Sequence, residues 1–174
     1  ILRRMTKYFP IAAEQNIMTS TLNFLHRTIF DTEQADSILW KNASRYVAWA
    51  RSKYGIGEAY VLFIWERSKF PVTAPYVQTM SCRSNPVCGS DLFSLYKEDL
   101  AGEYNDLIHH HAEVRQFSIG EALADVTEAV LEGIDRVRAS LTGEGKGTWE
   151  RFLSKYLTFH CLAPRYRVSE IITF

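Results

Sequence analysis

The stretch SIGEALADVTEAVLEGIDRVRASLTG, residues 118–143, decides the fold class. Its apolar side chains recur at intervals of three and four residues, a period that places them on one face of an α-helix. They are Ile119, Leu123, Val126, Val130, Ile134, Val137 and Leu141. Ser118 and Glu121 form the S-x-x-E pattern of a capping box, and Gly143 is a typical helix end. The stretch therefore predicts a long amphipathic helix that packs against a core.

The same period recurs along the rest of the chain. A stripe in the first 30 residues predicts a helix that packs on the core through Met18, Leu22, Leu25 and Ile29. Residues 58–70 favour a strand by propensity, but no strand of similar strength could pair with them, so we interpret them as a helix buried nearly all round. The glycines of residues 143–147 predict a hinge, followed by a last helix that Thr148 caps.

Residues 71–90 interrupt the helical pattern with three prolines, a glycine and several short polar residues. They predict one long irregular loop, a kind of segment that is often functional. The chain is 47% hydrophobic and 23% charged, which is typical of globular proteins. The sequence therefore predicts an all-α fold: a single helical domain over residues 1–174, built as a bundle of about six helices.

Charge is unevenly distributed along the chain. Residues 1–85 carry 11 Lys and Arg against 6 Asp and Glu, residues 86–135 carry 2 against 11, and residues 136–174 carry 7 against 3. Such a chain can neutralise itself by folding its acidic middle against its ends, or it can present faces of opposite sign to neighbouring molecules. The longest apolar run, residues 59–65, is far below the roughly 20 residues that a membrane span needs, so no membrane association is expected.

Three consecutive histidines, residues 109–111, stand between Asp106 and Glu113. Neighbours on a helix are about 100° apart, so the three rings cannot face one point. On a continuous helix Glu103, Asp106 and His110 would share a face and make a candidate metal site, although no matching motif exists on a second helix. The stronger interpretation is a pH-sensitive patch of Asp106, His110 and Glu113, in which the carboxylates favour the charged imidazole.

The three cysteines do not describe a disulfide framework, so a cytoplasmic or other reducing compartment is expected. Cys88 precedes a predicted helix, and a helix N-terminus lowers the pKa of a thiol. Cys88 is therefore a candidate nucleophile, with one of the five histidines as its base. A zinc site is disfavoured because Cys82 and Cys88 are spaced more widely than the paired cysteines of zinc motifs.

Basic side chains near both ends of the chain are candidates for contact with nucleic acid, since Arg and Lys bind phosphate and Tyr stacks on bases. These residues are Arg3, Arg4, Lys7, Arg45, Arg165 and Arg167. The chain carries no net charge and no recognised nucleic-acid-binding module, which argues for ordinary solvated charge instead.

No phosphate-binding glycine loop, nucleophile elbow or zinc-protease motif is present. The sequence therefore favours a non-catalytic structural or interaction subunit without a cofactor. Its expected partner is itself or another protein, with residues 76–90 and 164–174 as contact elements. The alternatives are a nucleic-acid-binding subunit of the coat or nucleoprotein kind and, third, a cysteine-nucleophile enzyme.

Overall fold

The computed structural model describes residues 7–33, 44–54, 56–70, 75, 78–79 and 89–172. Within these ranges the chain forms seven α-helices and two short 3-10 helices, and no β-strand. The helices are α2 (Ile11–Glu33), α3 (Ser44–Lys53), α4 (Ile56–Ile64), α6 (Gly89–Ala101), α7 (Leu107–Arg115), α8 (Ile119–Ser140), α9 (Gly143–Leu162), η1 (Pro164–Tyr166) and η2 (Val168–Glu170). The predicted all-α fold is confirmed.

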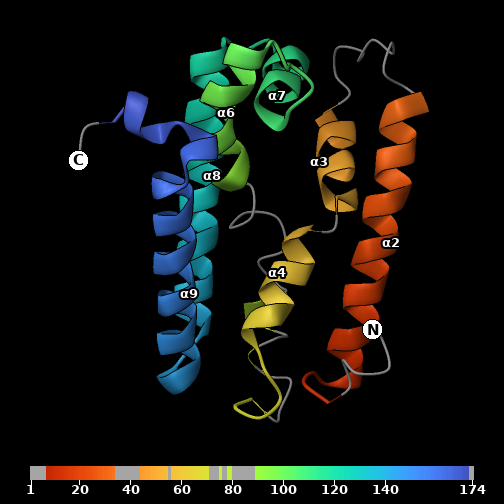
Figure 1. Cartoon of the computed structure of the whole chain (residues 1–174), viewed down its shortest axis with the longest axis vertical. Helices are drawn as coiled ribbons and strands as arrows, with labels where there is room; N and C mark the ends of the chain where they lie inside the picture. Colours follow the sequence, from red (N-terminus) through yellow and green to blue (C-terminus); the bar gives the residue numbers. More distant parts are fainter. Residues whose placement is uncertain are drawn as a thin grey trace.

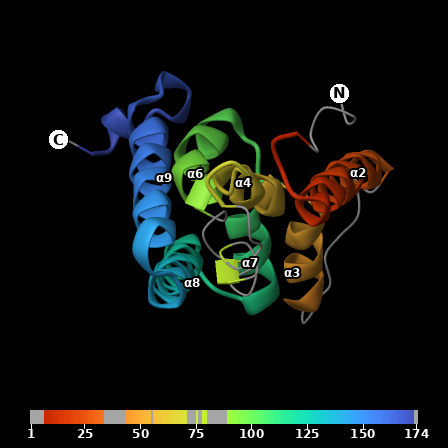
Figure 2. The same ribbon diagram turned by 90° about the horizontal axis from the view of Figure 1, so that it is seen from below.

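The helices are arranged with the longest ones at the two sides of the molecule. The antiparallel pair α8 and α9 forms one side, α2 forms the other, and α4 lies between them (Figure 1). Seen from below, α9, α6, α4 and α2 lie in one row, and α8, α7 and α3 lie in a second (Figure 2). The N-terminal end of α2 and the C-terminal end of α9 are therefore far apart.

The predicted helix at residues 118–143 is α8, and its N-terminus has the predicted capping box. The Glu121 amide donates to the Ser118 hydroxyl oxygen at 3.2 Å, and the Ser118 amide donates to the Glu121 carboxylate at 2.8 Å. Its apolar stripe meets α6, α7 and α9 in the largest core cluster, which consists of Leu95, Ile108, Ala112, Ala122, Val126, Val130, Ile134 and Leu153. This cluster holds α6, α7 and α9 against α8.

The hinge predicted at residues 143–147 is wrong, because α9 already begins at Gly143. The helix continues through the glycines since its first turns are held by packing. Gly145 is buried, with a Leu141 side-chain atom 3.8 Å from where its Cβ would be, and Trp149 is fully buried one turn later. Thr142, not Thr148, is the N-cap residue.

The ambiguous segment at residues 58–70 is helical through Ile64, so the helical interpretation is confirmed for that part. The expected all-round burial is wrong. Leu62 is completely buried against α2, whereas the Tyr60 and Phe63 side chains are about half exposed. Beyond α4 the chain turns, and Trp65 and Phe70 pack edge to face against each other in a second core cluster.

The helix predicted in the first 30 residues, α2, exposes the face that was predicted to pack on the core. Leu22, Leu25 and Ile29 are 63%, 53% and 58% exposed. The buried face carries polar side chains as well as apolar ones: Ala13, Glu14, Ile17, Ser20 and Arg27. The period of three and four correctly predicted a helix but not the face that packs, because α2 has apolar side chains on more than one side.

Most of residues 71–90, including Cys82 and Cys88, lie outside the described part of the chain. The tail after α9 forms the two 3-10 turns η1 and η2. Across the described ranges, no helix combines the length and apolarity needed to span a membrane.

Candidate functional site

Helix α6 carries a row of oxygen-bearing side chains that the sequence analysis did not single out. Ser90, Ser94 and Glu98 recur every four residues and therefore lie along one face of the helix. The buried Ser94 hydroxyl donates to the Asp91 carbonyl at 3.4 Å, and the Glu98 carboxylate pairs with the Lys97 ammonium at 2.8 Å. Both η1 and α9 pack against α6, so this helix adjoins the C-terminal segment.

The C-terminal segment is fastened to α6 through Glu170. Arg167 donates from Nε and Nη2 to the two Glu170 carboxylate oxygens at 2.7 and 2.8 Å, and the Tyr96 hydroxyl of α6 donates to Oε2 at 3.3 Å. The ion pair raises the pKa of Arg167 and lowers the pKa of Glu170. Arg167 has a left-handed backbone conformation, with φ of 57°, which joins η1 to η2.

Arg165 differs from Arg167 in its partners. Its guanidinium lies over the Tyr166 ring at 5.2 Å, and no carboxylate of the described residues pairs with it. Arg165 is exposed, whereas Tyr166 is buried. The end of α9 thus offers a cation that has no counter-ion among the described residues and is held on an aromatic ring beside α6.

The three consecutive histidines point to three different surroundings, as helical geometry predicted. The Nδ1 atom of His109 lies 2.6 Å from Asp106 Oδ2, and its Nε2 atom lies 3.2 Å from Asp99 Oδ1. The Nε2 atom of His111 lies 2.6 Å from Asp125 Oδ2 on α8. His109 and His111 therefore tie α7 to the helices on either side of it.

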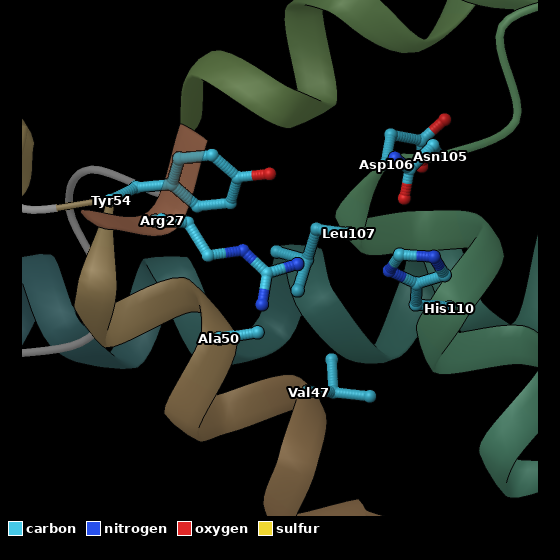
Figure 3. A pocket seen from close by; sticks show the side chains of 8 residues that line it. All are labelled: Arg27, Val47, Ala50, Tyr54, Asn105, Asp106, Leu107 and His110. Carbon is cyan, nitrogen blue, oxygen red and sulfur yellow. The ribbon is translucent and has the colours of Figure 1, made fainter. Parts of the chain in front are cut away.

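His110 faces a small cavity between α2, α3 and α7. The cavity measures about 30 Å³ and is lined by Arg27, Val47, Ala50, Tyr54, Asn105, Asp106, Leu107 and His110. Figure 3 shows Arg27 and Tyr54 on one side of it and Asp106 and His110 on the other. A space of this size holds about one water molecule.

Burial lowers the pKa of His110, and this effect exceeds the opposite effects of Asp106 and Glu113. The nearby Arg27 charge also lowers the pKa. Asp106 and Glu113 favour the charged imidazole as expected, but burial outweighs them and the surroundings as a whole favour the neutral ring. That Asp106, His110 and Glu113 form a pH-sensitive patch stays a prediction.

The candidate metal ligands do not share a helical face. Gly102, with φ of +72°, follows the last residue of α6, and Asp106 is the N-cap of α7. Glu103 therefore lies in the connection between two helices, and Asp106 binds His109 through its side chain and backbone. Throughout the described ranges, no group of three or more His, Cys, Asp and Glu side chains could hold a metal ion.

The remaining candidates are dispersed or lie outside the described residues. Lys7 lies before α2 and Arg45 is exposed on α3, whereas Arg165 and Arg167 follow α9 on the opposite side of the molecule (Figure 1). Arg3, Arg4 and Cys88 belong to the part that is not described. Cys161, near the end of α9, is a free and half-buried thiol.

The sequence analysis missed the serines and Glu98 of α6, and also Arg27. The serines could have been found from the four-residue spacing in SDLFSLYKE, residues 90–98. Arg27 is 2% exposed, and no local pattern predicts a buried arginine, because its tyrosine partner Tyr46 is 19 residues away in the sequence.

Comparison with known proteins identifies a family of enzymes. The model of the family described as trichodiene synthase (TRI5) matches residues 1–173. Terpene synthase 29 of Postia placenta is 36% identical over 175 residues, which cover 99% of this chain and 51% of that protein. Monoterpene synthase 25 of the same organism is 32% identical over 174 residues, covering 99% and 52%. Longiborneol synthase CLM1 of Gibberella zeae is 29% identical over 171 residues, covering 94% and 50%.

These matches overturn the expected functions. A structural subunit, a nucleic-acid-binding coat protein and a cysteine-nucleophile enzyme are all wrong, because the matched relatives carry the names of terpene synthases. The chain has no phosphate-binding glycine loop, nucleophile elbow or zinc-protease motif, so its sequence carries none of these signs of an enzyme. The chain spans about half the length of the curated relatives that it matches. It belongs to the trichodiene synthase (TRI5) family.

Proposed function

We propose that this chain forms part of the active site of a terpene synthase, an enzyme that makes a terpene from an isoprenoid diphosphate. The observation that carries the proposal is the family match over residues 1–173, together with the names of the relatives. The chain spans about half the length of those relatives, so it is assigned one part of the active site and not all of it.

The chemistry requires cations around the departing diphosphate. When the carbon–oxygen bond breaks, its electron pair leaves with the diphosphate and a carbocation remains on the isoprenoid. Positive groups that are already positioned where this negative charge develops lower the activation barrier for breaking the bond. Arg165 suits this role, because it is exposed, stacked on Tyr166 and not neutralised by a described carboxylate. Arg167 is not assigned this role, because its guanidinium is paired with the Glu170 carboxylate.

A divalent cation commonly accompanies a diphosphate in protein sites. Mg²⁺ keeps several waters and takes one or two carboxylates plus substrate phosphate oxygens, so it does not need a cage of three acidic residues. The oxygen set of Ser90, Ser94 and Glu98 on α6 has the right chemistry, and Glu98 would have to release Lys97 to bind the metal. Mg²⁺ held there would neutralise charge on the diphosphate.

Product analysis tests the proposal. The protein is incubated with Mg²⁺ and either geranyl or farnesyl diphosphate, and volatile products are identified by gas chromatography with mass spectrometry. Binding of inorganic pyrophosphate with Mg²⁺ is measured separately by calorimetry, so that a bound but unreactive site is also detected. The absence of both terpene formation and pyrophosphate binding would refute the proposal.

Two matched variants locate the diphosphate. We expect Arg165→Ala to weaken pyrophosphate binding and to lower kcat/KM roughly 100-fold, the scale for loss of one positioned charge-stabilising group. Arg136→Ala is the control, since Arg136 is exposed on α8 and forms an exposed ion pair with Glu132. Equal losses in both variants would indicate a general charge effect and contradict the assignment to Arg165.

The expected association with a second copy or another protein stays a prediction. Light scattering over a range of protein concentrations checks it.

A further inference from the structure

A continuous stack of side chains connects α6 to Arg165. The Phe93 and His160 rings are stacked with centroids 5.2 Å apart, and the His160 and Tyr166 rings are 4.6 Å apart. The Arg165 guanidinium lies over the other end of the stack, 5.2 Å from the Tyr166 centroid. The stack thus runs from α6 through the last turn of α9 to η1.

His160 is enclosed in this stack. It is 5% exposed, and two further rings of α9 contact it, Tyr156 at 4.2 Å and Phe159 at 5.2 Å. Its Nδ1 atom lies 2.8 Å from the Tyr156 carbonyl oxygen. A carbonyl only accepts hydrogen bonds, so Nδ1 carries the proton and the ring is held in one orientation.

The turn that carries Arg165 has little support of its own. η1 is only three residues long, and two backbone hydrogen bonds close it, from the Tyr166 amide to Ala163 at 3.0 Å and from the Arg167 amide to Pro164 at 3.2 Å. Short 3-10 turns have poor hydrogen-bond geometry. The buried Tyr166 ring is therefore the anchor of η1, and His160 is the ring against which it packs most closely.

We propose that His160 is a positioning residue that fixes Tyr166 and thereby holds Arg165 where it receives the diphosphate. His160 acts through its ring, by filling the space between Phe93 and Tyr166, and it touches neither substrate nor metal. This inference rests on the proposed function, since it gives that function one further residue. The packing of Tyr166 against His160 is present without any ligand.

Two substitutions separate the ring from its hydrogen bond. His160→Asn keeps a donor for the Tyr156 carbonyl but removes the ring, whereas His160→Phe keeps a ring and removes the donor. We expect His160→Asn to weaken the binding of inorganic pyrophosphate with Mg²⁺ about tenfold, the scale of one lost aromatic contact. His160→Phe should bind within about threefold of the unmodified protein. His26→Asn, at an exposed position of α2, is the control.

Hydrogen exchange tests the positioning role in the absence of ligand. We expect the Tyr166 and Arg167 amides to exchange about tenfold faster in His160→Asn, while the amides of α8 keep their rates, because local opening of η1 becomes easier. His160→Phe should restore slow exchange. Slow exchange in both variants, or equal loss of pyrophosphate binding in both, would overturn the proposal.

The two proposals fail in different ways. If Arg165→Ala leaves pyrophosphate binding unchanged, the diphosphate assignment fails, but the exchange rates of η1 still report on the stack. If Arg165→Ala abolishes binding and His160→Asn changes neither binding nor exchange, only the role of His160 fails.

Discussion

Arg27 and Asp31 form an ion pair across one turn of α2, with the Arg27 side chain 3% exposed and the Asp31 side chain 20% exposed. The Arg27 Nη1 atom also donates to the Tyr46 hydroxyl at 3.2 Å, and the Tyr54 hydroxyl donates to Asp31 at 2.8 Å. The guanidinium lies within 5.6 Å of the Phe30, Tyr46 and Tyr54 ring centroids. This cluster joins α2 to α3 and adjoins the cavity that His110 lines.

We expect Arg27→Met to lower the free energy of unfolding by about 3 kcal/mol. Removing one member of a buried ion pair leaves the other charge without compensation, and it also removes the contacts with the aromatic rings. Urea denaturation followed by circular dichroism measures the change. The double variant Arg27→Met with Asp31→Leu should recover part of the loss, because no unpaired charge remains. A double variant as unstable as the single one would contradict this account.

Ser118→Ala should lower the free energy of unfolding by about 1 kcal/mol, the usual effect of losing an N-cap hydroxyl. The Ser118 hydroxyl accepts the Glu121 amide and donates to the Glu121 carboxylate. The Ser118 amide and, to a lesser extent, the Ser118 hydroxyl donate to the Glu121 carboxylate and lower its pKa, so the contribution of these two bonds is lost as the pH falls through that pKa. Ser140→Ala, at the other end of α8, is the control in thermal denaturation, since its hydroxyl only donates to the Arg136 carbonyl.

The elements that the sequence predicted well are those set by local signals. The start of α8 and its apolar stripe depend on side chains within a few turns of one another, and the capping box formed as the residues Ser118 and Glu121 predicted. The divergence of the three histidine rings was also predictable, because it follows from helix geometry alone.

The rest depends on contacts between distant residues, which a local pattern does not contain. The Phe93 ring stacks on His160, which is 67 residues away in the sequence, and the Tyr96 hydroxyl donates a hydrogen bond to Glu170, which is 74 residues away. The sequence analysis noted the tail arginines but not the rings that hold Arg165. It also had no means of seeing that His110 would be buried beside Arg27, which reverses the expected direction of its pKa.

The unexpected orientation of α2 predicts a contrast between two of its side chains. Ile17 is 6% exposed and packs with Leu62, whereas Leu25 is 53% exposed. We expect Ile17→Ala to lower the free energy of unfolding by roughly 3 kcal/mol and Leu25→Ala by less than about 0.5 kcal/mol. Chemical denaturation of both variants measures the difference. A larger loss of stability in Leu25→Ala than in Ile17→Ala would support the orientation predicted from the apolar stripe.

Acidification should destabilise the fold through His110. Burial lowers its pKa in the folded chain below the 6.5 of an ordinary histidine, so the unfolded chain binds more protons in the range between the two values. The contribution of the neutral ring is present above pH 6.5 and is lost as the pH falls through the folded pKa. Asp106 and Glu113 oppose this effect, and Arg27 adds to it.

The free energy of unfolding, measured at intervals from about pH 8 to about pH 4.5, gives the proton linkage. We expect His110→Gln to reduce the slope below pH 6.5, because its side chain has no proton to take up. Burial also lowers the pKa of His160, so adding His160→Phe should reduce the slope further. His26→Gln, at an exposed position, is the control. If His110→Gln steepens the slope, the carboxylates prevail over burial and the patch favours the charged imidazole after all.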